Sequence, residues 1–303
     1  MVSWQHPVVR PDEVAKALEG GFLEGREVRE LSTDWGVTFA VDIVPPELRE
    51  AWRELRALVP RLGRWPVAAM AMWDGPFDER SFSRWLYGEG DNSPQAICAR
   101  SRELTLEDAL AGPNGRDAQR YDAMFWDKLV EYQLDATRRR VGDAPPTEEV
   151  AALDLWPDMF ALERWLFDWE EARQPTTAPE PGRHADWFEP PECTLLLLPT
   201  ALSEEVPAYL SFFGAEGPGG GHERLIALLR SWRERYAAET VASWGTMLQL
   251  KVNAPPADLE DAFELSVEQW IAAPPTLALP GVTIRDHART LWNRPEWFLH
   301  DRP

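Results

Sequence analysis

The sequence predicts an α+β fold in which a mixed or antiparallel sheet is covered by helices. Short runs near both ends of the chain alternate apolar and polar residues with period two, which is typical of strands. Longer segments repeat apolar residues every three or four positions, which is typical of amphipathic helices. A chain of 303 residues with 44% hydrophobic content can bury a full core, so we expect one large domain or two modest ones.

Residues 1–75 are expected to form an N-terminal α/β part. A short helix is predicted over residues 11–18, and an alternating, half-buried strand over residues 37–44. Residues 46–59 repeat apolar side chains at helical spacing, and residues 65–73 lack polar side chains, as in a strand covered on both faces. The last three elements make a strand–helix–strand unit. The apolar stripe of its helix consists of Leu48, Trp52, Leu55 and Val59.

Residues 76–173 are rich in tryptophan, acidic residues and helix formers, which predicts a helical middle. Residues 105–108 resemble a capping box at a helix start. A long helix is expected over residues 117–140, and a second helical stretch over residues 148–173 that Pro157 interrupts or kinks. The side chains expected to face inward from the long helix are Tyr121, Met124, Phe125, Leu129 and Tyr132.

Residues 174–192 contain several prolines that disfavour regular structure, which predicts a Pro-rich linker. Residues 193–303 are then expected to form a C-terminal α+β module. It begins with a strand over residues 194–198 and an extended segment over 207–213, followed by a helix that starts near residue 222. The apolar stripe of this helix consists of Leu225, Leu228, Leu229, Trp232 and Tyr236.

A hairpin and a further helix complete the C-terminal module. Residues 240–244 and 247–252 are two short runs of β type joined at Gly245. Asp258 is expected to cap a helix that Pro274 and Pro275 end. The order is therefore strand, helix, hairpin, helix. The last segment, 284–298, is predicted to be one more short helix with a terminal aromatic anchor.

The chain carries 31 basic and 51 acidic residues, a net charge of −20. Such a field repels a phosphate backbone, so ordinary nucleic-acid binding is not expected. It can attract a basic partner, or it can simply keep a protein in solution. The first residues lack the basic start and apolar run of a signal peptide, and no apolar stretch approaches the roughly 20 residues that cross a bilayer. We expect a cytoplasmic protein without membrane contact.

The residue types that carry catalysis or bind metals are not grouped in the usual patterns. None of the five histidines is paired at i, i+4 spacing, and Cys98 and Cys193 lie in no CxxC motif. The glycine-rich residues 217–221 can cradle an anion or form a flexible turn, but they lack the wording of a P-loop or dinucleotide-binding loop. The sequence predicts no catalytic residue, no metal and no cofactor.

The C-terminal module resembles a known family of uncharacterised bacterial proteins. The wording HERLIALLRSWRERYAAETV, then LQLKVNAPP and SVEQW, is similar to domain of unknown function 4253. The likeness covers roughly residues 193–300 and reaches a Pro-x-x-Gly-x-Trp-Pro block within residues 60–67. It implies a fold and supplies no established activity. The positions that match the family wording are His222, Leu229, Arg230, Trp232, Tyr236, Glu239, Glu268 and Gln269.

The chain departs from the family wording at several positions. Ala237 stands in place of a glycine, and Thr246 and Gln249 stand in place of acidic residues. Residues 270–275 replace a family segment that includes a cysteine and an aspartate. Loss of a thiol and of carboxylates argues against a shared catalytic role at these positions.

His222 and Arg230 share one predicted helix, and Glu268 lies on the following helix, so the three form a polar patch if these helices pack side by side. Trp232 and Tyr236 belong to the same candidate binding site. The competing interpretation is an interior ion pair or a helix cap. We expect a non-enzymatic binding protein of immunity or regulatory type, whose acidic, Trp-rich surface covers a basic protein partner.

The alternative function belongs to another class. An enzyme or small-ligand binder would use a cleft between the N-terminal and C-terminal modules, lined by Trp65, Trp73 and Arg230. A deep apolar pocket with convergent polar groups favours this alternative, and a flat acidic face favours the binding protein.

Overall fold

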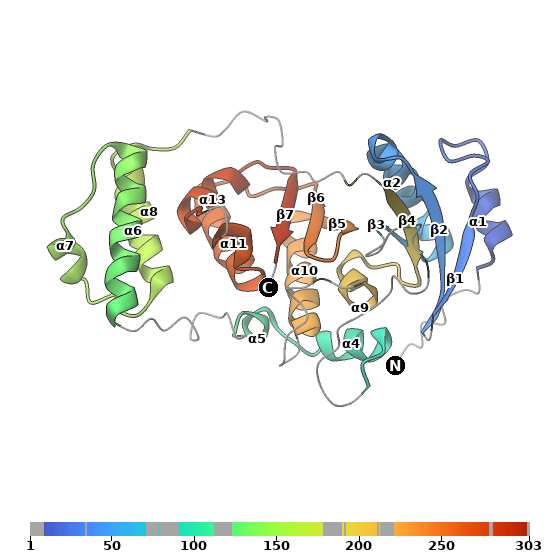
Figure 1. Cartoon of the computed structure of the whole chain (residues 1–303), viewed down its shortest axis with the longest axis horizontal. Coiled ribbons are helices and arrows are strands. Elements are labelled where there is room, and N and C mark those ends of the chain that lie inside the picture. Colours follow the sequence, from blue (N-terminus) through green and yellow to red (C-terminus); the bar gives the residue numbers. More distant parts are fainter. Residues whose placement is uncertain are drawn as a thin grey trace.

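The computed structural model describes residues 9–33, 35–70, 78, 91–111, 123–177, 190, 192–210, 212, 221–278 and 281–301. The strands among these residues form one seven-stranded mixed sheet in the order β1-β2-β4-β3-β5-β6-β7. Helices pack on both faces of the sheet, and further helices extend to one side of it (Figure 1). The predicted α+β class is confirmed.

The strands come from both ends of the chain. Neighbouring strands are antiparallel except β3 and β5, which are parallel. Their bounds are β1 (Arg29–Thr33), β2 (Gly36–Ile43), β3 (Trp65–Ala69), β4 (Cys193–Leu198), β5 (Ala238–Ser243), β6 (Met247–Val252) and β7 (Glu296–His300).

Strand β4 lies between two strands of the N-terminal part. It pairs with β2 on one side and with β3 on the other, and every one of its residues is buried. The apolar run that predicted this strand therefore reflects cover on both faces. Because β3 in turn pairs with β5, the N-terminal and C-terminal modules share one sheet rather than two.

The N-terminal helices follow their predicted apolar stripes. They are α1 (Pro11–Ala17), the 3-10 turn η1 (Pro45–Glu47), α2 (Leu48–Ala57) and α3 (Val59–Leu62). The predicted stripe of α2 and α3 is buried throughout. Gly63 then adopts the left-handed conformation that ends α3, with φ of 62°, and the chain enters β3 directly afterwards.

The C-terminal module differs from the prediction in two places. Residues 207–213 were expected to be extended, but Pro207 lies in a short helix, because it occupies the first turn, where a helix does not need its missing N–H. The tail was expected to be a helix with an aromatic anchor; it contains both a helix and strand β7, in which Trp297 and Leu299 face the core. The helices of this module are η3 (Ser203–Glu205), α9 (Val206–Tyr209), α10 (Gly221–Tyr236), α11 (Leu259–Ala272), α12 (Pro275–Ala278) and α13 (Ile284–Leu291).

Helices α2 and α10 cover opposite faces of the sheet. Trp297 lies opposite Leu250 across β7 and β6, and its ring packs edge-to-face on Trp232 of α10, with 6.1 Å between the ring centroids. Lys251, the next residue of β6, lies over the ring of Trp52 in α2. Since successive residues of a strand point to opposite faces, the two helices lie on opposite sides of the sheet.

The helical middle consists of a pair that packs beside the C-terminal module and an arm that projects from it. Helices α4 (Pro94–Ser101) and α5 (Leu106–Leu110) pack on α10. Helix α6 (Ala123–Val141) runs beside α8 (Met159–Glu171), and the short α7 (Thr147–Ala151), which lies in the connection from α6 to α8, is at the far left of Figure 1. The capping box predicted at Thr105 is present at the start of α5, with Asp108 in the third position.

The inward face predicted for the long helix α6 is wrong in part. Leu129 packs on the C-terminal core as predicted, but Phe125 and Tyr132 are exposed, and the buried positions include the polar residues Gln133 and Thr137. These polar side chains are buried because they bond to a buried arginine of α13, described below, and apolar periodicity does not indicate them. The predicted residue Tyr121 and the side chain of Met124 lie outside the described residues.

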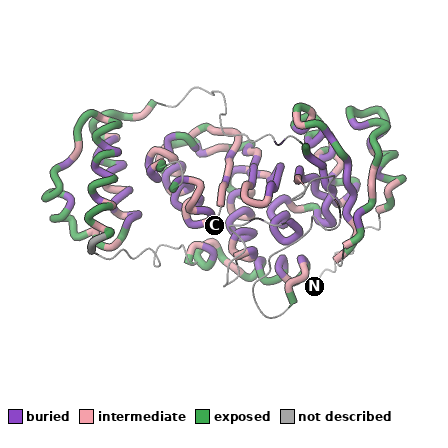
Figure 2. Tube along the Cα trace, viewed as in Figure 1, coloured by how far each residue is buried: buried purple, intermediate pink, exposed green. Residues whose placement is uncertain are grey.

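Three groups of buried side chains form the interior. One surrounds β2, β3 and β4, the second joins α10, α11 and α13 to β5, β6 and β7, and a small third group lies between α6 and α8. Figure 2 shows buried segments concentrated in the sheet and its covering helices, with long exposed segments in the α7 region. Most of the predicted linker, residues 178–189 and 191, lies outside the described residues. None of the described helices combines the length and apolar character that a membrane crossing requires.

Candidate functional site

Helix α10 supplies most of the residues predicted to form a site. Its apolar stripe is buried as predicted, and His222 is also buried near its first turn. Four polar residues of this helix reach neighbouring helices, in two directions. The predicted polar patch is consequently divided between two places.

The first place is the seam between α10 and α11. Trp232 donates from Nε1 to Glu268 Oε2 at 2.7 Å, and Arg235 donates to the same oxygen. Tyr236 donates from its hydroxyl to Asp261 Oδ1 at 2.6 Å. Burial, with the bond to Asp261, raises the pKa of Tyr236, so its hydroxyl stays protonated and serves as a donor. The structure thus brings together three of the predicted residues: Trp232, Tyr236 and Glu268.

Arg230 points away from Glu268. It donates from Nη1 to the carbonyl of Ser101 at 3.0 Å and from Nη2 to the carbonyl of Leu104 at 2.6 Å. These carbonyls lie at and just after the end of α4, where the last C=O groups of a helix lack partners within the helix. The expectation that Arg230 meets Glu268 is wrong, because the guanidinium caps another helix.

Trp65 lies in β3 on the side of α2. Its indole donates from Nε1 to the carbonyl of Thr240 at 2.9 Å and packs edge-to-face on Trp52, with 6.3 Å between the ring centroids. Since α10 covers the opposite face, Trp65 and Arg230 do not line one cleft. Trp73, the third predicted lining residue, lies outside the described residues.

Sequence reasoning missed two buried carboxylates at the end of β4 that pair with partly exposed arginines, a group that we name the η3 cluster. It joins η3 to α4 and α10. Glu205 accepts from Arg102 Nη2 and from Thr200 Oγ1, both at 2.6 Å. Glu204 Oε1 lies 3.1 Å from Arg233 Nη2. The members of the η3 cluster are Cys98, Arg102, Thr200, Glu204, Glu205 and Arg233.

Glu204 is the unbalanced member of the η3 cluster. Its Oε2 is buried and has no hydrogen-bond partner among the described residues. Burial raises the pKa of Glu204, with Arg233 acting in the opposite direction, so this carboxyl takes up a proton more readily than an exposed glutamate. Burial also raises the pKa of the nearby Cys98 thiol, and the charge of Glu205 adds to the shift. Cys98 is therefore a neutral thiol and a poor nucleophile.

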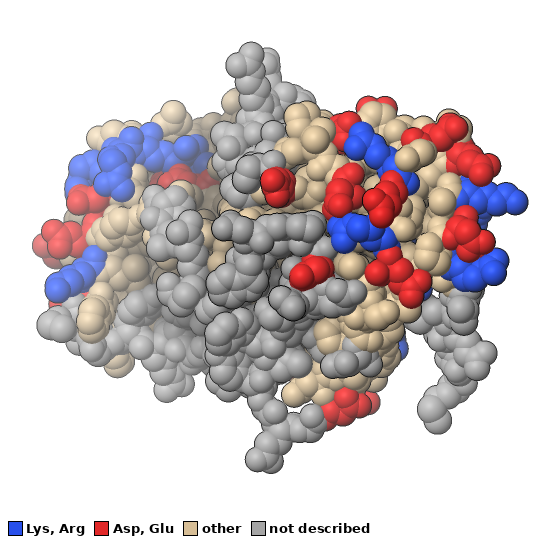
Figure 3. Space-filling model, turned by 45° about the vertical axis from the view of Figure 1, so that its right-hand side comes forward, with Lys and Arg blue, Asp and Glu red and all other residues tan. Residues whose placement is uncertain are grey.

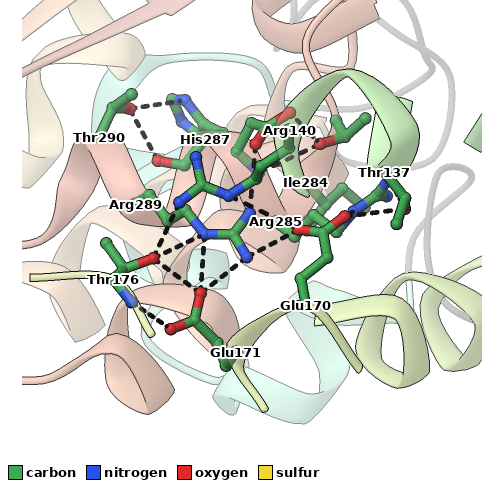
Figure 4. Close-up of polar contacts among 12 residues, drawn as sticks. Thr137, Arg140, Glu170, Glu171, Thr176, Ile284, Arg285, His287, Arg289 and Thr290 are labelled. Carbon is green, nitrogen blue, oxygen red and sulfur yellow. Dashed lines mark hydrogen bonds and ion pairs between the residues drawn. The ribbon is translucent and has the colours of Figure 1, made fainter. Parts of the chain in front are cut away.

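The second buried cluster joins α13 to α6 and α8, and we name it the α13 cluster (Figure 4). Arg285 is 0% exposed and lies between Glu163 and Glu170, whose side chains are each 1% exposed. Its guanidinium donates from Nη1 to Glu163 Oε2 and from Nε to Glu170 Oε1, both at 2.7 Å. Gln133 and Thr137 of α6 accept its remaining N–H groups, so all five are used.

Arg289 extends the α13 cluster by one helical turn. Its Nη2 lies 2.8 Å from Glu170 Oε2 and 2.8 Å from Glu171 Oε1, and its Nε lies 3.2 Å from Thr176 Oγ1. Burial alone would lower the pKa of Arg285, but the charges of Glu163 and Glu170 outweigh burial, and its pKa is raised. Arg285 therefore stays protonated, and its bonds hold the α6–α8 pair against the C-terminal module.

In the sequence, the pattern that could have indicated the α13 cluster is a set of polar residues spaced so that they share one face of a helix. Arg285 and Arg289 are four residues apart, and so are Gln133 and Thr137; Glu163 and Glu170 are seven apart, within the apolar stripe of α8. For the η3 cluster the signal was two adjacent acids between apolar runs, at Glu204 and Glu205. Neither signal names a partner, because the partners lie on other helices.

The described residues offer no evident centre for metal chemistry. Within this part of the chain, no group of three or more His, Cys, Asp or Glu side chains is arranged so that it could hold a metal ion. Cys98 and Cys193 are both free and buried, and burial raises the pKa of Cys193 to about 12. The described polar groups can bind a proton at Glu204 and can fix helices through the buried ion pairs of Arg285.

Fold and clusters together define an α+β protein with one mixed sheet and two buried ionic clusters. Residues 194–301 match the family model described as Domain of unknown function (DUF4253), so this part of the chain is similar to that family. The resemblance expected from the sequence is confirmed there, and the match does not reach residues 60–67. No curated protein matches the chain, and no solved structure matches it.

The family match ends inside the sheet. Strand β4 belongs to the matched residues, yet its partners β2 and β3 both lie outside them. Strand β3 lies between β4 and β5 in the sheet. The matched strands β4 and β5 therefore belong to one sheet only because a strand from outside the matched segment pairs with both of them. The sheet therefore depends on strands outside the matched segment.

Proposed function

We propose that the chain is a non-enzymatic acidic binding protein, of immunity or regulatory type, that masks a basic protein partner. The observation that carries the proposal is the excess of acidic residues, 51 against 31 basic ones. A surface field of this sign attracts cationic proteins and accelerates their association.

Burial removes little of the acidic excess from the surface. Among the described residues three arginines are buried: Arg64, Arg285 and Arg289. Five glutamates are buried as well: Glu163, Glu170, Glu204, Glu205 and Glu268. The interior therefore holds only two more acids than bases, and most of the acidic excess lies at the surface.

Many exposed carboxylates lack a basic neighbour. Glu19, Glu27, Glu50, Glu148 and Glu149 are exposed and form no ion pair with a described residue. Figure 3 shows that Lys and Arg side chains alternate with Asp and Glu over the right-hand part of that view. Where the two signs alternate in this way the local field is weaker.

The test is affinity purification from a lysate of the source cells at low salt. Recovered proteins are identified by mass spectrometry, and the strongest candidate is purified and titrated against the chain. We expect a partner of high isoelectric point whose Kd rises at least tenfold between 50 and 300 mM salt, because screening weakens exposed charge pairs. Recovery of acidic or neutral proteins alone, or a Kd that is indifferent to salt, contradicts the proposal.

A further inference from the structure

The residues from 141 to 163 have an unusual charge distribution. They contain six carboxylates and no lysine or arginine. Glu163 is buried in the α13 cluster, and the other five, Asp143, Glu148, Glu149, Asp154 and Asp158, are exposed. None of these five forms an ion pair with a described residue. This segment, which includes α7, therefore carries five exposed carboxylates without an ion-pair partner among the described residues, and it follows directly on Arg138, Arg139 and Arg140 at the end of α6.

Two large apolar side chains are exposed within the same segment. Trp156 is 54% exposed and Leu153 is 37% exposed. Their neighbours Val150 and Leu155 face inward and pack with the small core between α6 and α8. The segment is therefore folded onto its own core and still leaves a tryptophan and a leucine outside. Single exposed apolar residues are common, but these two lie in the same connection between α6 and α8 as the exposed carboxylates.

The segment is held rigidly at its end. Asp158 caps α8 by accepting from the backbone N–H of Ala161 at 3.0 Å. Helix α8 is in turn fixed to α13 by the buried pairs that Glu163 and Glu170 form with Arg285. A surface that is already ordered loses less conformational entropy when a partner binds.

We propose that this surface, formed by Glu148, Glu149, Leu153, Asp154 and Trp156, binds a basic amphipathic segment of a protein partner. The assignment rests on the proposed function and names the place where the partner docks. Lysine and arginine side chains of the partner pair with the carboxylates, and its apolar side chains cover Leu153 and Trp156. The face of the indole also attracts a guanidinium or ammonium group.

Charge disfavours other occupants of the surface formed by Glu148, Glu149, Leu153, Asp154 and Trp156, which we name the α7 surface. A second copy of this chain would bring carboxylates against carboxylates, and a nucleic acid or an anionic membrane would bring phosphates against them. An uncharged apolar partner would leave the carboxylates desolvated without a counter-charge, which is unfavourable. A cationic segment with apolar side chains satisfies both features of the surface.

A defined peptide tests the proposal. The probe is a fluorescein-labelled 16-residue peptide with lysine and arginine on one helical face and leucine on the other, titrated by fluorescence anisotropy in 150 mM salt. The test variants are E148Q/E149Q/D154N, which removes three charges, and L153A/W156A, which removes the apolar groups. The matched controls are E19Q/E27Q/E50Q and F22A/V44A, at exposed residues of the N-terminal part.

We expect each test variant to weaken binding about tenfold and each control variant to weaken it less than about twofold, since only local charges and contacts are lost. Binding of the peptide is also expected to slow amide hydrogen exchange over residues 147–158. Thermal unfolding of every variant is compared with that of the native chain, because truncation of exposed side chains leaves the core intact.

Two failures have different meanings. If the charge variant and its N-terminal control weaken binding equally, the acidic field binds the peptide without a fixed site, and the α7 surface is the wrong assignment. If the native chain fails to bind the peptide even in 50 mM salt, the proposed binding of basic partners is itself contradicted.

Discussion

The two buried ionic clusters are built from the same residue types but differ in balance. In the α13 cluster, Arg285 uses all five of its N–H groups, and both of its carboxylate partners are buried with it. Glu170 Oε2 and Glu204 Oε2 are both buried without a hydrogen-bond partner among the described residues, but Glu170 Oε2 lies 2.8 Å from the buried guanidinium of Arg289, whereas the arginine paired with Glu204 is partly exposed. A buried charge is least costly when its counter-charge is buried with it, so we expect the first cluster to fix structure and Glu204 to change its protonation more readily.

The largest expected effect comes from breaking the balanced cluster. Arg285→Met leaves Glu163 and Glu170 buried with fewer counter-charges, which should lower the free energy of unfolding by about 3–5 kcal/mol. The measurement is urea denaturation followed by far-UV circular dichroism. Because Arg285 contacts both α6 and α8, we also expect faster hydrogen exchange in these helices.

A charge-matched control separates loss of the arginine from loss of the balance. The triple variant Glu163→Leu, Glu170→Leu and Arg285→Met removes the charges together, and apolar replacement of a whole buried ion pair is often neutral or stabilising. It should regain most of the lost stability. A single Arg285→Met variant that loses less than about 1 kcal/mol would mean that water reaches the two carboxylates.

An intermediate effect is expected from equivalent substitutions in the two clusters. Glu170→Gln breaks pairs with Arg285 and Arg289 and should lower the free energy of unfolding by about 1–3 kcal/mol at pH 7.5. Glu204→Gln removes a buried charge that lacks full pairing, so stability should stay within about 1 kcal/mol of the native value or rise. A large loss on Glu204→Gln would show that its pair with Arg233 outweighs the cost of burial.

The pH dependence of stability sharpens this contrast. Burial raises the pKa of Glu204 in the folded protein above its value in the unfolded chain, so the folded protein binds this proton more tightly. Its contribution to stability therefore falls as the pH rises from about 4.5 through the raised pKa. The free energy of unfolding of the native protein and of Glu204→Gln is measured as a function of pH. Relative to the variant, the native protein should lose stability as the pH rises across this window, and the difference should then level off. A flat difference would contradict the raised pKa.

The elements of the fold were predictable where apolar periodicity decides the structure. The stripes of α2 and α10, the uniformly apolar strands β3 and β4 and the hairpin at Gly245 each bury side chains that water excludes, so the sequence alone indicates them. Strand β7 was less visible because Glu296, Phe298 and His300, which alternate with its buried residues, include an aromatic side chain that resembles a core residue. The order of the strands was not predictable, since β4 lies between β2 and β3 through pairing across more than a hundred residues.

The candidate site was predictable only in part, for a related reason. Glu268 does lie against α10, as the helix packing suggested, but it meets Trp232 and Arg235 rather than Arg230. The rotation of one helix against another decides which side chains touch, and a single sequence does not contain that rotation. Arg285 lies in the short helix predicted over residues 284–298, but the sequence does not single it out, because a buried arginine carries no apolar signal; in the structure it joins α13 to α6 and α8.

The smallest expected effect tests whether burial, rather than distance, sets the strength of these pairs. Arg138 and Asp135 of α6 are 2.5 Å apart, closer than Arg285 and Glu163, but both side chains are more than half exposed. Water already satisfies these charges, and holding two long side chains in one position costs entropy, so Arg138→Met should change the free energy of unfolding by less than about 0.5 kcal/mol. Urea denaturation at 50 and 500 mM salt measures this. If the loss approached that of Arg285→Met, the contrast between exposed and buried pairs would fail, because contact distance alone would then account for both.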